Sequence, residues 1–201
     1  MGTYYKAAPG ADCEMANLTD PEGVKKVHAE YLAAGAQAIK TNTFGLPRMA
    51  AAQMPGWEEL AEAGWKLACD AAAEKGAAVF ADLGPALDTE AAPASSAYGL
   101  VAQQFAALGA KNFLFETLSS DVGIVEAVKA LRVAVPDAFV MVSFAVLPDG
   151  YTREGLLFRD LLRRMEQSGV VDAVGLNCVS APGAMKKLVQ SLGETLLPRS
   201  E

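Results

Sequence analysis

The hydrophobic and polar positions of this chain repeat one arrangement five times: a helical segment, a helix breaker, a short apolar run and then polar residues. The apolar runs predict strands at residues 36–40, 77–81, 112–115, 139–142 and 170–176. Strands that alternate with helices indicate a parallel sheet. The runs contain few polar positions, which is typical of strands that are covered on both faces.

The helical segments have recognisable ends. In the first, Thr19 can cap the N-terminus, Glu22 can complete a capping box and Pro21 suits the first turn. Gly35 is expected to end this helix. Further helices are predicted at residues 57–74, 97–108, 121–133, 154–167 and 182–192.

Polar residues follow each predicted strand at its carboxyl end. They are Thr41-Asn42-Thr43, Asp82, Glu116-Thr117, Ser143 and Asn177-Cys178. Parallel βα repeats place the carboxyl ends of all their strands on one rim, where (β/α)8 barrel enzymes build their sites. The sequence therefore predicts one site that is assembled from five strands.

The number of strands leaves two α/β architectures open. A closed (β/α)8 barrel needs eight strands, whereas a five-stranded open sheet would be a complete doubly wound domain. The chain has no GxGxxG motif after its first strand and no GxxxxGKS or GxxxxGKT motif. The nucleotide-binding forms of the open sheet therefore lack their usual support.

Composition and charge narrow the function. With 201 residues, 52% hydrophobic and 20% charged, the chain can fold around one sizeable core. A formal net charge of -7 disfavours nucleic-acid binding, because phosphate backbones are also negative. No apolar stretch reaches the about 18 residues of a membrane span. Residues 1–10 lack the apolar core of a signal peptide, so we expect a cytoplasmic protein that does not bind membranes.

The cysteines and the histidine give little material for a metal site or a Ser-His-Asp triad. There are three cysteines, Cys13, Cys69 and Cys178, without a CxxC pair, and one histidine, His28. A sparse, odd set argues against a disulfide framework. Cys69 lies in the middle of a predicted helix and is expected to pack in the core, and Cys13 is expected to be a bystander thiol.

Several motifs point to a family. ANLTDPE at 16–22, His28, Tyr31, AGA at 34–36 and TNTFG at 41–45 come first. DLGP at 82–85, FET at 115–117, VSF at 142–144, DG at 149–150 with Thr152, and GLNC at 175–178 follow. In this order they resemble the homocysteine S-methyltransferase family, which includes the homocysteine domain of cobalamin-dependent methionine synthase. The resemblance extends to about residue 185, and MGT at 1–3 resembles the end of the family's opening DGAMGT.

The resemblance implies an incomplete (β/α)8 TIM barrel that lacks most of strand one and strands seven and eight, within a single homocysteine-binding domain at residues 1–201. It also implies a zinc ion held by three cysteines at the strand ends. Cys178 would be one ligand, and the other two form an adjacent pair that lies beyond this chain. Glu116 would hold the substrate amine, and Asn42 and Thr43 would line the pocket. No residue is assigned a catalytic role.

The implied reaction transfers a methyl group to the thiol of homocysteine and yields methionine. A thiol with a pKa of about 8.5 is mostly protonated at neutral pH, and zinc would convert it to a thiolate. A corrinoid, a folate or a sulfonium compound would donate the methyl group. Since one cysteine cannot form such a site, we expect the chain alone to be inactive. We also expect it to self-associate through exposed strand edges.

Each implied residue also has a structural interpretation. Cys178 could be a small buried hydrophobic residue, and Glu116 could form a salt bridge at a solvated strand end. Asn42 and Thr43 could cap the turn into Pro47.

Three other polar residues and the function of the whole chain also leave alternatives open. Asp82 could point to the rim or stabilise its own loop, Asn177 could orient the cysteine loop, and His28 is expected to be structural. The chain could be a non-catalytic remnant, or a subunit that needs a partner chain for its missing strands. It could also be a small flavodoxin-like binding domain without a metal.

Overall fold

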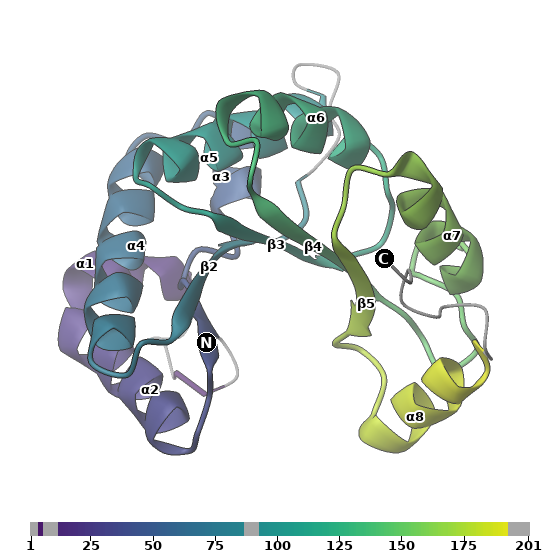
Figure 1. Cartoon of the computed structure of the whole chain (residues 1–201), viewed down its shortest axis with the longest axis horizontal. Coiled ribbons are helices and arrows are strands. Elements are labelled where there is room, and N and C mark those ends of the chain that lie inside the picture. The colour runs from purple at the N-terminus through teal and green to yellow at the C-terminus, as the bar shows by residue number, and fades with distance from the viewer. Residues whose placement is uncertain (1–3, 6–11, 87–92, 193–201) are drawn as a thin grey trace.

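The computed structural model describes residues 4–5, 12–86 and 93–192 of the chain. Five strands form one parallel sheet: β1 (Ala38–Lys40), β2 (Ala78–Leu83), β3 (Asn112–Leu118), β4 (Phe139–Ala145) and β5 (Ala173–Asn177). The sheet curves into an open arc, with the helices on its convex side (Figure 1). The MGT motif at residues 1–3 lies outside the described residues.

The order of the strands distinguishes between the two architectures. Neighbouring strands follow the chain as β1-β2-β3-β4-β5. A doubly wound sheet reverses direction at a switch point, as in the flavodoxin-like order 2-1-3-4-5. Sequential addition of βα units in one direction is how a (β/α)8 barrel is built. The predicted incomplete barrel is therefore confirmed, and the described strands do not have the flavodoxin-like order.

Each predicted helical segment contains a helix, although α5 begins three residues before its predicted start and α7 begins four residues after it, and three short helices are added. They are η1 (Cys13–Met15), α1 (Ala16–Thr19), α2 (Pro21–Ala33), α3 (Leu46–Ala51), α4 (Trp57–Ala73), α5 (Ala94–Ala107), α6 (Ile124–Ala134), α7 (Phe158–Ser168) and α8 (Pro182–Gln190). The sequence did not predict η1, α1 and α3. In the described residues no helix is long and apolar enough to span a membrane.

The start of α2 corrects one prediction. Asp20 is the N-cap instead of Thr19, and its carboxylate accepts the Gly23 N–H at 3.0 Å. Thr19 ends the short helix α1, where its hydroxyl donates to the Met15 carbonyl at 3.0 Å. The Thr19 hydroxyl is therefore engaged with the carbonyl four residues earlier and does not cap α2, and Asp20 caps it instead.

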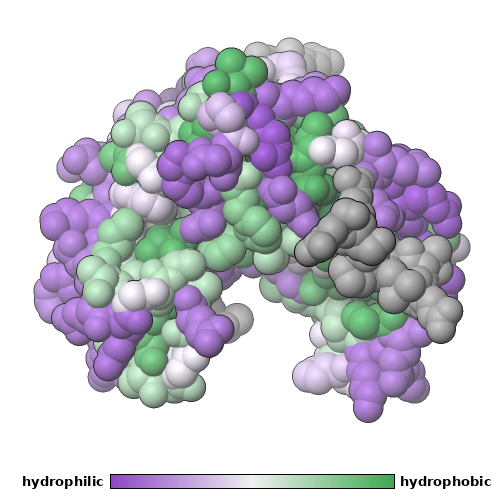
Figure 2. Space-filling view, in the orientation of Figure 1, coloured by the Kyte–Doolittle hydropathy of each residue, from purple (hydrophilic) through white to green (hydrophobic). Residues whose placement is uncertain are grey.

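Side chains alternate between the two faces of the sheet, because successive strand residues point to opposite sides. The convex face packs against the helices through fully buried residues: Phe113, Phe115, Val140, Val142 and Phe144. The concave face is less covered. There the rings of Phe80 and Phe139 meet edge to face at a centroid distance of 6.0 Å, and Phe139 is 39% exposed. Figure 2 shows the hollow that this concave side encloses.

Candidate active site

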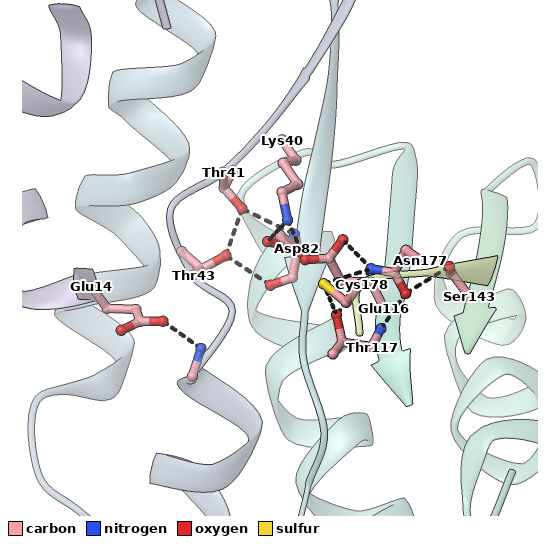
Figure 3. A network of polar contacts seen from close by, with 11 residues as sticks. Glu14, Lys40, Thr41, Thr43, Asp82, Glu116, Thr117, Ser143, Asn177 and Cys178 are labelled. Carbon is pink, nitrogen blue, oxygen red and sulfur yellow. Dashed lines mark hydrogen bonds and ion pairs between the residues drawn. The ribbon is translucent and has the colours of Figure 1, made fainter. Parts of the chain in front are cut away.

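The polar residues at the carboxyl ends of the strands meet in one network, as the sequence predicted (Figure 3). Beside it lies a pocket of about 570 Å³, here called the rim pocket. Its lining includes Lys40, Asn42, Asp82, Glu116, Thr117 and Cys178. A pocket of this size fits a small-molecule ligand. Strands β1, β2, β3 and the end of β5 thus contribute to one cavity.

Three charged side chains form the floor of this network. The Lys40 ammonium lies 2.9 Å from Asp82 Oδ2 and also contacts Glu116 Oε1. The Asp82 side chain is 2% exposed, that of Glu116 13% and that of Lys40 33%. Asp82 therefore points to the rim, which was one of its two predicted positions. Lys40 was not predicted, although it is the one charged residue inside a predicted apolar run at 36–40.

Burial and charge shift the pKa values of Asp82 and Lys40. Burial raises the pKa of Asp82 to about 7, the nearby Lys40 opposes the rise, and Glu116 adds to it. Burial alone would lower the pKa of Lys40, but the two carboxylates outweigh it and the pKa is raised. Lys40 therefore stays protonated at neutral pH, whereas burial disfavours the ionised form of Asp82. Asp82 Oδ1 is buried without a hydrogen-bond partner among the described residues.

The side-chain amide of Asn177 joins the ends of β3, β4 and β5. Its Oδ1 accepts the Thr117 N–H and the Ser143 hydroxyl, both at 3.0 Å. Its Nδ2 donates to Thr117 Oγ1 at 3.0 Å and to Glu116 Oε2 at 3.2 Å, and lies 3.7 Å from Cys178 Sγ. This one side chain therefore fixes the positions of Glu116 and Cys178 relative to each other.

The backbone around Asn177 is strained. Thr117, Cys178 and Val179 have positive φ angles of 60°, 55° and 51°. A residue with a Cβ rarely adopts this conformation, and for the β-branched Thr117 and Val179 it is especially unfavourable. Thr117 is also where the pairing of β3 with β4 shifts register. The hydrogen bonds of Asn177 compensate the strain at Thr117.

The predicted residues Asn42 and Thr43 occupy different surroundings. Asn42 lines the rim pocket, and its Nδ2 donates to the Cys13 carbonyl at 2.8 Å and to Asn17 Oδ1 at 3.0 Å. Thr43 is fully buried, and its hydroxyl lies 2.5 Å from that of Thr41 and donates to the Asp82 carbonyl at 2.9 Å. Thr43 thus supports the rim from behind the pocket.

The segment before α1 also shapes the rim. Glu14 is buried, and its carboxylate accepts the Gly45 N–H at 2.6 Å. Asn17 is buried as well and donates to the carbonyls of Asn42 and Leu60 at 2.8 and 3.2 Å. Neither contact was predicted, although Glu14 lies two residues before the ANLTDPE motif and Asn17 lies inside it.

The three cysteines lie in different places. Cys178 is exposed and lines the rim pocket, with its Sγ 3.4 Å from Thr117 Oγ1. Cys13 lines the same pocket, and burial raises the pKa of its thiol. Cys69, which was expected to pack in the core, is half-buried on α4 and is not among the buried residues of that helix. His28 is buried on α2, and burial lowers its pKa to about 4.

A zinc ion fits the described residues poorly. Nowhere in the described ranges do three His, Cys, Asp or Glu residues come together in an arrangement that could hold a metal. A structural or catalytic zinc site needs at least three protein ligands. Cys178 is in position to supply one, so the described residues do not form a zinc site by themselves.

Comparison with known proteins identifies a family with a matching sequence. A family model described as homocysteine S-methyltransferase matches residues 3–200. No curated protein matches the chain.

Solved structures share the fold. The metallated form of the homocysteine methyltransferase MmuM from Escherichia coli is similar, with a TM-score of 0.74 and 22% identity over 92% of this chain and 73% of that chain. Its apo form has a TM-score of 0.65 and 24% identity over 92% and 72%. A catalytic lysine mutant of the sialic acid aldolase from Ruminococcus gnavus has a TM-score of 0.51 and 14% identity over 87% and 52%.

Proposed function

This chain belongs to the homocysteine S-methyltransferase family, and we propose that its rim pocket binds homocysteine and holds the thiol for methylation to methionine. The membership gives the enzyme class. The roles of individual residues, the metal and the methyl donor are our proposals. We treat residues 1–201 as one homocysteine-binding domain.

The observation that carries the proposal is the pairing of Glu116 with Cys178 at one pocket. The Asn177 Nδ2 atom lies 3.2 Å from Glu116 Oε2 and 3.7 Å from Cys178 Sγ, so the carboxylate and the thiol are close neighbours. Homocysteine carries an ammonium and a thiol on one short carbon chain. We assign the ammonium to Glu116, because an anionic acceptor makes the stronger hydrogen bonds, and the sulfur end to the side of Cys178.

Asn42 and Thr43 have supporting roles in this proposal. Asn42 forms part of the pocket wall, where its amide is held by Cys13 and Asn17. Thr43 anchors the end of β1 to the backbone of Asp82. Both positions keep the pocket in shape before the substrate arrives, which lowers the cost of ordering on binding.

We propose Cys178 as a zinc ligand only together with thiolates that residues 1–201 do not supply, because the described residues, which include all three cysteines, do not form a zinc site. Bound zinc would supply acidity that holds a substrate thiol as its thiolate at neutral pH. Support comes from the exposed position of Cys178 at the pocket. A corrinoid or a folate is our proposal for the methyl donor.

Binding measurements test the proposal without the methyl donor. Homocysteine and its deaminated analogue, a thiol carboxylate, are titrated by calorimetry under reducing conditions into the full chain and into Glu116→Gln. We expect the wild type to prefer homocysteine and the variant to lose about tenfold or more of that preference, as for a lost hydrogen bond to a charged group. The matched control Glu62→Gln, on the exposed side of α4, should keep it. Absence of homocysteine binding to the wild type would refute the proposal.

A further inference from the structure

Lys40 is a cation at the floor of a pocket that we assign to an amino acid. It is the last residue of β1, lines the rim pocket and keeps one third of its side chain exposed. A buried or half-buried ammonium must be compensated by partners, and Asp82 lies 2.9 Å from it on the buried side. Glu116 is a second carboxylate partner of Lys40, and it also lines the rim pocket.

Both members of the Lys40–Glu116 pair keep unused hydrogen-bonding capacity. A lysine ammonium has three donors, and among the described residues Lys40 contacts two acceptors, Asp82 and Glu116. An ionised carboxylate offers about four acceptor sites. Glu116 accepts from two donors among the described residues, Lys40 and Asn177, so acceptor sites remain for a ligand. A ligand can therefore bind to each group without breaking the existing contacts.

The two groups present opposite charges side by side to the same cavity. An α-amino acid has the complementary pair, an ammonium and a carboxylate on one carbon atom. Asp82 anchors the Lys40 ammonium from the buried side, so the cation is held at the floor of the pocket before any ligand binds. Two carboxyl groups face the single ammonium of Lys40, which also favours the ligand's ammonium.

We infer that Lys40 is a specificity-determining residue that binds the carboxylate of the amino-acid substrate while the neighbouring Glu116 binds its ammonium. This inference rests on the proposed function. It predicts that the chain selects thiols which carry a carboxylate next to the amine. Lys40 binds the substrate directly and takes no part in the transfer of the methyl group.

The test compares homocysteine with its decarboxylated aminothiol, which keeps the amine and the thiol. Both are titrated by calorimetry under reducing conditions into the full chain, Lys40→Gln and Lys40→Arg. The ratio of the two dissociation constants is taken within each preparation, so it does not depend on the folded fraction. Glutamine can still donate to Asp82, which protects the fold. Lys111→Gln is the matched control, because Lys111 pairs with Asp137 at 2.8 Å directly before β3 at the opposite end of the sheet.

We expect the wild type and Lys111→Gln to prefer homocysteine by about tenfold to a hundredfold, as for a hydrogen-bonded ion pair. Lys40→Gln should reduce this preference to about twofold or less, and Lys40→Arg should keep part of it. A Lys40→Gln variant with the full wild-type preference would overturn the inference, and so would a wild type without any preference. Failure of the wild type to bind either thiol would instead refute the proposed function.

Discussion

Replacement of Asn177 by Ala should destabilise the fold far more than a single rim residue normally does. Four hydrogen bonds of 3.0–3.2 Å are lost, two to Thr117 and one each to Ser143 and Glu116. Each is worth about 0.5–1.5 kcal/mol net, and water replaces some of them because the site is partly buried. We therefore expect a loss of about 2–3 kcal/mol, or a decrease in Tm of about 5–10 °C for a chain of this size.

Urea unfolding followed by circular dichroism measures this loss. Asn112→Ala is the matched control, since its amide makes one hydrogen bond, to the Val79 carbonyl at 3.1 Å, at the amino end of β3. Its cost should be about 1 kcal/mol. Asn177→Asp tests the direction of the amide, because a second carboxylate would then face Glu116 in place of an N–H donor.

The pH dependence of the stability of Asn177→Asp distinguishes the loss of hydrogen bonds from a change in side-chain packing. At pH 7 the two carboxylates of Asn177→Asp should repel each other, and the variant should be at least as unstable as Asn177→Ala. Below pH of about 4 protonation should restore much of the stability. A loss under about 0.5 kcal/mol for Asn177→Ala, or wild-type stability of Asn177→Asp at pH 7, would show that Asn177 does not hold the rim together.

Four further outcomes are expected. Asp82 has a pKa raised from 3.8 to about 7, so its contribution to stability is present below pH of about 4 and is lost as the pH rises through 7. Relative to Asp82→Asn, the free energy of unfolding of the wild type should therefore fall by about 4 kcal/mol between these pH values, and parallel plots of the two free energies against pH would contradict this. In Gly84→Ala the new Cβ would lie 2.5 Å from the Phe44 carbonyl, so Tm should fall by about 2–10 °C, whereas an unchanged Tm would mean that the loop shifts freely. With Cys178 as the one proposed thiolate ligand, the 201-residue chain should lose its zinc to a chelator, and stoichiometric zinc in elemental analysis would disprove this. Because β1 and β5 are the edges of the sheet in the described residues, the chain should sediment as oligomers at micromolar concentration, and a single monomer peak would count against that expectation.

The periodicity of the sequence located all five strands, but the observed strand ends differ from the predicted ones. Strands β2, β3 and β4 continue two or three residues past the apolar runs, to Leu83, Leu118 and Ala145. Polar residues such as Asp82 and Ser143 therefore lie inside strands. In a strand that is open on one face, a polar side chain can point to the hollow while its neighbours stay buried, so polarity does not mark the end.

The sequence alone determined the five strands, the longer helices, their alternation and the family, because periodicity and motifs depend on residues that are close along the chain. It also predicted that Glu116, Asn177 and Cys178 would share one rim, since parallel strands align their carboxyl ends. The contacts among them were not determined in this way.

The tertiary structure decided which side chains meet. Lys40 contacts Asp82 and Glu116, residues 42 and 76 positions away, because the curvature and register of β1, β2 and β3 bring them together. Asn177 reaches β3 and β4 in the same way. Side chains from separate strands pair according to register and curvature, which the whole packed sheet sets.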